Sequence, residues 1–138
     1  MNLLKGTLVY LLCTFVVQAV SHFVVFKAHY ASVSFLRPEP IFVLGILAML
    51  VQGAVLTFLY LRHASLASTT LRGWKFGLLA GAFFVSYSVF AEPAKYLVPA
   101  VGSWMLVEAA AGFVQFSLFG IVLGVLLPPP REPRTRAL

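Results

Sequence analysis

The sequence predicts an all-α membrane protein, a polytopic bundle of four transmembrane helices. Two features of composition support this: 61% of the 138 residues are hydrophobic, and only 10% are charged, whereas soluble domains contain about 25% charged residues. A third observation is that the apolar residues fall into four long runs, over residues 7–26, 40–62, 74–91 and 102–127. Each run is long enough to cross a hydrocarbon layer of ~30 Å at ~1.5 Å per helical residue.

Each run should be a helix and not a strand of a β-barrel. Backbone amides in lipid must find hydrogen-bond partners within the segment, and a helix provides them. Barrel strands alternate apolar and polar positions over about 10 residues. Residues 41–50 are instead apolar at nearly every position, so the sequence favours helices.

The first run resembles a signal peptide in two respects. Lys5 precedes it, and residues 19–21 (Ala-Val-Ser) resemble a cleavage site. The run is as long as a full span, however, so we expect it to be retained. It also contains Cys13, the single cysteine, which excludes an internal disulfide.

Prolines mark the boundaries of the later runs. Pro40 suits the first turn of the second helix, where its missing N–H costs nothing. Pro93 lies in the short connection that follows the third run, and Pro128 begins a run of three prolines that ends the fourth. Residues 1–127 should therefore form the transmembrane domain, and residues 128–138 a disordered, basic, proline-rich cytoplasmic tail.

The formal charge of +6 is mainly a signal of topology. With four crossings, one side of the membrane carries seven basic residues: Lys5, Arg62, Arg72, Lys75, Arg131, Arg134 and Arg136. The other side carries three: Lys27, Arg37 and Lys95. Because basic residues favour the cytoplasmic side, we expect a bacterial inner-membrane protein with both termini cytoplasmic. Membrane lipids are expected partners, and nucleic acid is not.

A faint internal repeat suggests two tandem helical hairpins. Three pairs of segments match, at offsets of 67, 66 and 63: Leu4-Lys5-Gly6 with Leu71-Arg72-Gly73, Ala28-His29-Tyr30 with Ala94-Lys95-Tyr96, and Val51-Gln52 with Val114-Gln115. Two such hairpins would be related by a pseudo-twofold axis along the membrane normal. Chance similarity between apolar stretches is the alternative.

Polar residues within the runs predict an intramembrane site in the outer half of the bundle. Three of them lie roughly 6–9 Å below the outer surface at helical rise, and three glutamines lie one layer deeper. The predicted site comprises His22, Glu108, Tyr87, Gln18, Gln52 and Gln115. The glutamines can line a hydrated path or simply tie helices together.

Glu108 should face the bundle interior, because a carboxylate at the centre of a span costs about 3 kcal/mol on insertion scales. His22, at matching depth, is the expected partner, and Lys95 is a second candidate. A histidine–carboxylate pair can hold or relay a proton. A neutral hydrogen bond between two helices is the alternative.

A second polar group is expected at the outer mouth, formed by Glu92, Lys95 and Tyr96, with His29, Tyr30, Arg37 and Glu39 opposite. These residues could recognise a solute or a partner. Alternatively they are solvated, with Tyr30, Tyr96 and Trp104 forming an aromatic belt at the interface.

Glycines spaced by four residues predict close helix packing. They are Gly73, Gly77 and Gly81 in the third run and Gly120 and Gly124 in the fourth. The third and fourth spans would pack together through them, or they would form a dimer face.

No metal site and no cofactor are predicted. His22 and His29 are seven residues apart, about two helical turns, whereas ligands of one small ion prefer neighbouring turns. Enzyme signatures are also missing, and aspartate is absent from the sequence. A catalytic role is therefore not the favoured interpretation.

Three segments carry a resemblance to uncharacterised bacterial inner-membrane proteins of four spans: Gln18-Ala19-x-Ser21-His22, Arg37-Pro38-Glu39-Pro40 and Ala94-Lys95-Tyr96. The resemblance implies fold and location over nearly the whole chain, but no activity.

The favoured hypothesis is a small membrane protein that moves or senses a small solute or a proton through the outer polar site, with a homo-oligomer enclosing the pathway. One alternative is an accessory or assembly subunit of a larger membrane complex. Another is a membrane-embedded enzyme acting on a lipid or quinone.

Overall fold

The structure, a computed structural model, describes residues 1–37, 39–62 and 70–127. Within these ranges every regular element is helical, and four segments are long and apolar enough to span a membrane, which confirms the predicted fold class. These segments are Asn2–Val25, Phe42–Arg62, Thr70–Lys95 and Val101–Leu126. The predicted tail, residues 128–138, lies outside the described residues.

The first and third spans begin with helical pieces in the same order. Each has a long α-helix followed by a π-helical turn: α1 (Asn2–Val20) and η1 (Ser21–Val25), then α4 (Thr70–Ser86) and η2 (Tyr87–Ala91). A short α-helix follows each turn: α2 (Lys27–Ala31) lies beyond the end of the first span, whereas α5 (Glu92–Lys95) completes the third. The second and fourth spans are single helices, α3 (Phe42–Arg62) and α6 (Val101–Leu126).

The third span is longer than the apolar run predicts, because the helix continues past Ala91 to Lys95. Pro93 does not stop it, since this proline lies in the first turn of α5, where a missing N–H is tolerated. The first span begins at Asn2, ahead of the predicted start.

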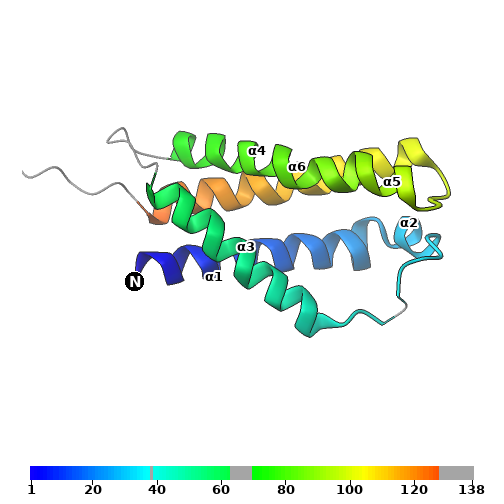
Figure 1. Cartoon of the computed structure of the whole chain (residues 1–138), viewed down its shortest axis with the longest axis horizontal. Coiled ribbons are helices and arrows are strands. Elements are labelled where there is room, and N and C mark those ends of the chain that lie inside the picture. Colours follow the sequence, from blue (N-terminus) through cyan, green and yellow to red (C-terminus); the bar gives the residue numbers. More distant parts are fainter. Residues whose placement is uncertain (38, 63–69, 128–138) are drawn as a thin grey trace, which may run out of the picture.

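Three interfaces hold the bundle together. α4 and α6 lie side by side along most of their length, and α1 packs against both α3 and α6 (Figure 1). α3 is tilted across α1 and meets α4 over only a short stretch (Figure 1). The order around the bundle is therefore α3, α1, α6, α4, and the α3–α4 side is the least closed.

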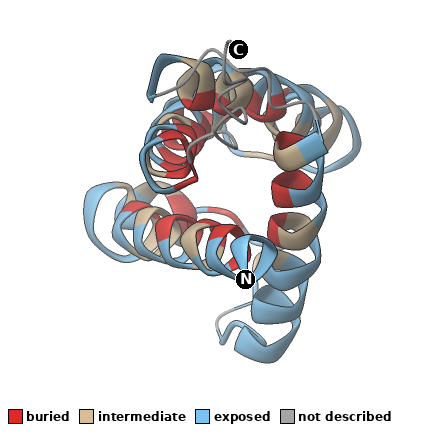
Figure 2. Cartoon of the chain, turned by 90° about the vertical axis from the view of Figure 1, so that its left-hand side faces the viewer, coloured by how far each residue is buried: buried red, intermediate tan, exposed pale blue. Residues whose placement is uncertain are grey.

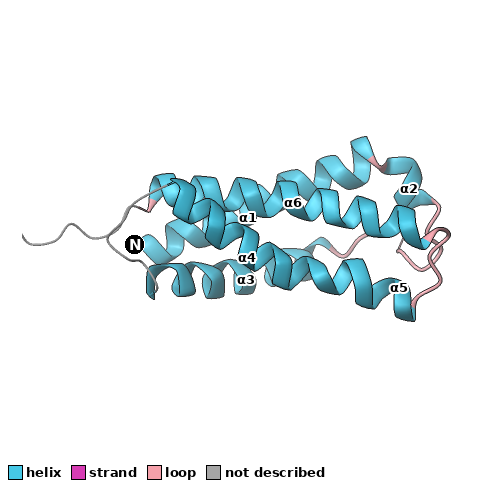
Figure 3. Ribbon diagram, turned by 90° about the horizontal axis from the view of Figure 1, so that it is seen from above, coloured by secondary structure: helices cyan, strands magenta, loops and turns pink. Residues whose placement is uncertain are grey.

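Buried residues face the centre of the bundle and exposed apolar residues face outward (Figure 2). One core cluster includes Tyr10, Phe119 and Leu123, all nearly inaccessible. A second cluster, at the end where the outer connections lie (Figure 3), contains Tyr30 and Trp104. An apolar exterior is what hydrocarbon requires of a spanning bundle.

The glycines of α4 and α6 lie between these two helices. A Cβ at Gly73 would meet the Gly120 carbonyl oxygen and approach Gly124 Cα to 2.6 Å, and one at Gly77 would approach Gly120 Cα to 2.9 Å. Small residues thus allow the two backbones to touch. The surface that a glycine-mediated dimer would use is occupied within the chain.

The π-turns are placed at matching positions in the two halves. Ser21–Val25 and Tyr87–Ala91 begin and end 66 residues apart, the offset at which the tripeptides after them match. The contacts made by glycines recur as well: Gly6 faces Thr57 in the first hairpin, and Gly73 faces Gly120 in the second. Gly73 lies 67 residues after Gly6, and Gly120 lies 63 residues after Thr57.

The backbone of the π-turn η2 is hydrogen-bonded by a side chain of the fourth span. Trp104 donates its indole N–H to the carbonyl oxygen of Ser88 at 2.8 Å, and its side chain is only 3% exposed. A tryptophan that the sequence assigns to an aromatic belt is therefore part of the outer core cluster.

Candidate functional site

A polar pocket of about 180 Å³ lies between the four spans. Each span contributes to its lining, which consists of Tyr10, Gln18, Gln52, Phe84, Val85, Ser88, Glu108, Gly112, Gln115 and Phe116. Glu108 is the lining residue with a carboxyl group, and no lysine or arginine is among them. Four of the six predicted intramembrane residues thus line one pocket: the three glutamines and Glu108.

The glutamines are held in fixed orientations by hydrogen bonds between spans. Gln18 donates through Nε2 to Gln115 Oε1 at 2.7 Å, and Gln115 donates through Nε2 to the Thr14 hydroxyl at 3.1 Å. Tyr10 donates its hydroxyl to Gln52 Oε1 at 2.8 Å. These bonds join α1 to both α6 and α3, so the glutamines link helices while also facing the pocket.

Glu108 is bound by Tyr30, a residue that the sequence analysis placed at the outer mouth and in the aromatic belt. The Tyr30 hydroxyl donates to Glu108 Oε1 at 2.8 Å, and the side chain of Tyr30 is only 7% exposed. Tyr30 lies on α2, beyond the π-turn η1. The sequence signal was weak, because Tyr30 follows the apolar run and looks like an interfacial residue.

His22 contacts the same tyrosine. Its ring stacks on the Tyr30 ring, with centroids 3.7 Å apart and planes 8° from parallel, and the edge of Tyr30 meets His29 from another direction. The Nδ1 atom of His22 lies 3.1 Å from the Gln18 carbonyl oxygen. Among the described residues, His22 and Glu108 are therefore connected through Tyr30 and share no direct hydrogen bond.

Burial, with the added effect of the negative charge on Glu108, raises the pKa of the Tyr30 hydroxyl above its ordinary value of 10.0. Tyr30 therefore stays protonated and able to donate to Glu108 at physiological pH.

Tyr87 lies away from the pocket. It is 51% exposed, and Lys95 donates through Nζ to its hydroxyl at 3.2 Å while lying 4.7 Å from the ring centroid. Lys95 is thus turned toward Tyr87 on the outside of the third span, where an exposed cation and ring can attract each other. Neither residue reaches Glu108.

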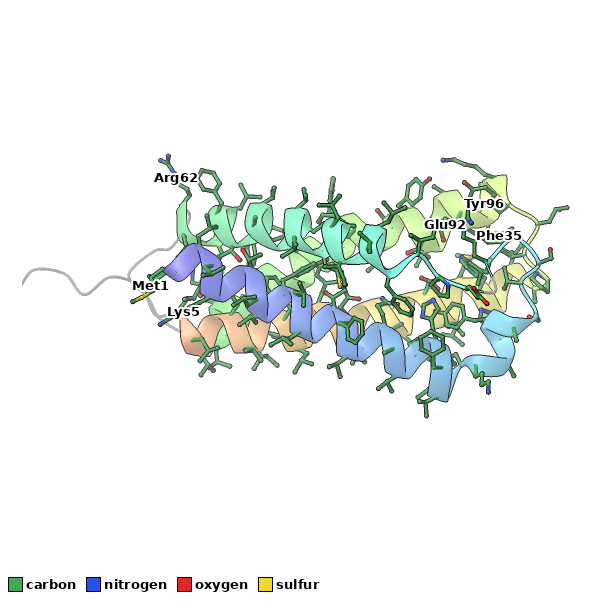
Figure 4. The ribbon with its side chains drawn as sticks, turned by 90° about the horizontal axis from the view of Figure 1, so that it is seen from below. Met1, Lys5, Phe35, Arg62, Glu92 and Tyr96 are labelled. Atoms are coloured by element: carbon green, nitrogen blue, oxygen red, sulfur yellow. The ribbon has the colours of Figure 1, made fainter. Side chains whose placement is uncertain are left out.

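The other residues of the predicted outer mouth lie at one end of the bundle, where Figure 4 shows Glu92, Tyr96 and Phe35 together. Tyr96 stacks on Phe35 with ring centroids 5.0 Å apart. Glu92 is half-buried, and its charge acts on Tyr30 together with that of Glu108.

A second cavity, of about 360 Å³, lies beside the first. It is an apolar groove between the first span and the outer half of α3, and its lining includes His22, Phe23, Gly45 and Ile46. Gln18 lines both cavities. The predicted residues are thus divided: His22 faces the groove, and Glu108 faces the polar pocket.

Metal-ligating side chains do not gather into any group of three or more in the part of the chain that the structure describes. Comparison with protein-family models, with curated proteins and with solved structures finds no match to this chain. Inference about function therefore depends on the geometry of the pocket.

Proposed function

We propose that this membrane protein binds a small polar solute or a proton at Glu108 and moves it across, or senses it in, the bacterial inner membrane. The observation that carries the proposal is a polar pocket reached by all four spans and containing one carboxylate. An ionisable residue inside a span is costly and generally marks a pathway or a binding site. Cavities for drug-sized ligands measure about 300–1,000 Å³, so a pocket of about 180 Å³ favours a smaller species.

The alternatives explain less of this geometry. An accessory subunit needs exposed docking surfaces but no polar interior. An enzyme acting on a lipid or quinone would use the apolar groove beside His22, which leaves Glu108 in the neighbouring pocket without a role.

The proposal is tested with purified protein in proteoliposomes that contain a pH-sensitive dye. Under an imposed membrane potential, we expect proton flux above that of protein-free vesicles, and Glu108→Gln should abolish it. Glu39→Gln is the matched control, because it makes the same chemical change on the exposed outer connection. Flux that is identical in the two variants would contradict a transport role for Glu108.

A further inference from the structure

The charge of the pocket is unbalanced. Glu108 is the carboxylate in its lining, and the lining contains no lysine or arginine. Tyr30 supplies a hydrogen bond to Oε1 but no positive charge. Glu108 is half-buried, and a partly buried carboxylate with no counter-charge in the lining of its pocket favours the binding of a cation.

The aromatic residues that line the pocket suit an organic cation. Three aromatic rings line it, from Tyr10, Phe84 and Phe116. The rings of Phe84 and Phe116 are stacked with centroids 5.9 Å apart, and those of Tyr10 and Phe116 are 6.1 Å apart. Aromatic faces attract organic cations, and the attraction increases when water is excluded.

The remaining lining adds hydrogen-bond acceptors but no further negative charge, which a divalent metal ion would require. Gln52 presents an amide oxygen that accepts from Tyr10, and an oxygen has room for a second donor. A divalent ion carries two positive charges, whereas the lining holds a single carboxylate, so such an ion would leave a buried excess of positive charge. Binding of a proton to Glu108 requires neither the three aromatic rings nor an open volume beside the carboxylate.

From this combination of one carboxylate, aromatic walls and small volume, we infer that the pocket binds a small organic cation, such as a protonated amine or a methylated ammonium ion. The inference rests on the proposed function, because it names the class of solute for the same site. The ammonium group lies against Glu108, and its methyl groups contact the rings.

Isothermal titration calorimetry on the full chain in lipid nanodiscs tests this assignment. The probes are methylammonium and tetramethylammonium, with methanol and tert-butanol as neutral counterparts of matching shape. We expect each cation to bind at least about tenfold more tightly than its neutral counterpart. Glu108→Gln should weaken cation binding by at least about tenfold, since a buried charge partner is removed, and Glu39→Gln should leave it unchanged.

Two further variants separate the contribution of the carboxylate to binding from that of the aromatic rings. Glu108→Asp keeps the charge and should keep the preference for cations over neutral counterparts. Phe84→Leu removes one ring and should weaken tetramethylammonium binding by roughly 2- to 30-fold. Thermal unfolding of each variant shows whether the fold is retained.

The inference is overturned if the wild type does not prefer cations over neutral counterparts, or if Glu108→Gln binds both cations as well as the wild type. If proton flux still depends on Glu108 in that case, the site conducts protons and the proposed function stands without the organic cation. If cation binding depends on Glu108 but neither proton flux nor uptake of methylammonium into the same vesicles does, the cation assignment stands and the transport role fails.

Discussion

Tyr30 contacts side chains that lie up to 78 residues away from it in the sequence. Its hydroxyl binds Glu108, and its ring lies against both His22 and His29. The sequence predicts His22 and Glu108 to lie at similar depth, and the structure places both against Tyr30, a residue that was assigned to the interface. Depth can be counted along a helix, whereas the direction of a side chain after a π-turn cannot be read from the apolar pattern.

Replacing Tyr30 with phenylalanine should destabilise the protein in a pH-dependent manner. Near pH 7, losing a hydrogen bond to a carboxylate should lower the free energy of unfolding by about 1.5–3 kcal/mol. Above pH 10.0 the phenol ionises in the unfolded state while the raised pKa keeps it protonated in the folded state, so the wild type loses stability as pH rises. The difference between wild type and Tyr30→Phe should therefore narrow above pH 10.0, measured by thermal unfolding in detergent.

Tyr96→Phe provides the control for this prediction. Tyr96 lies at the matching position of the second half, 66 residues later, but is 46% exposed and stacks on Phe35 through its ring. Its replacement should change stability little at any pH. Equal effects of the two substitutions would show that the hydrogen bond between Tyr30 and Glu108 does not contribute to stability.

At the scale of whole elements, the sequence correctly predicts four helices that are long and apolar enough to span a membrane, because this property depends on length and hydropathy. The ends differ by a few residues, most clearly where α5 continues the third span through Pro93. The π-turns had no signal of their own in the apolar pattern. They occur 66 residues apart, which supports the interpretation of the chain as two related hairpins.

The contact between α4 and α6 should be sensitive to a single added methyl group. In Gly77→Ala the new Cβ would meet the Phe116 carbonyl oxygen and lie 2.9 Å from Gly120 Cα. Both neighbours are backbone atoms that cannot rotate away, so we expect a loss of about 1–3 kcal/mol. Unfolding in detergent with increasing denaturant measures the loss.

Gly102→Ala is the matched substitution on α6. A Cβ at Gly102 meets nothing within 4 Å, and alanine favours helix over glycine by about 1 kcal/mol. The stability of the Gly102→Ala variant should equal that of the wild type or be slightly higher. If Gly77→Ala were equally harmless, the backbones of α4 and α6 would have to separate at little cost.

At the scale of the molecule, the two ends of the bundle differ in charge. Figure 4 shows Met1, Lys5 and Arg62 at one end and Glu92 and Tyr96 at the other. We propose, from the excess of basic residues on the first side, that this side is cytoplasmic.

Cysteine labelling in spheroplasts tests the orientation. In a Cys13→Ala background, Ser34→Cys lies on the exposed outer connection and Asn2→Cys at the exposed amino-terminal end. A membrane-impermeant maleimide should label position 34 directly and position 2 only after the membrane is permeabilised. The opposite pattern would invert the proposed topology.

The arrangement of the whole molecule explains why the site was only partly predictable. Hydropathy determines that four helices cross the membrane, but it does not determine how each is rotated or tilted. Tyr87 and His22 were predicted to lie at the same depth, yet Tyr87 is half exposed on the outside of the third span and His22 lines the groove beside α3. The glutamines and Glu108 share the pocket because all of them point toward the bundle axis.

The bond between Trp104 and Ser88 has a consequence for the backbone of the third span. Peptide oxygens released by a widened turn have no water to bind inside hydrocarbon, so each requires a donor from a neighbouring helix. The indole supplies that donor, and phenylalanine at position 104 could fill the same space without supplying it. Trp104 thus supplies the hydrogen bond that makes an irregular turn compatible with lipid.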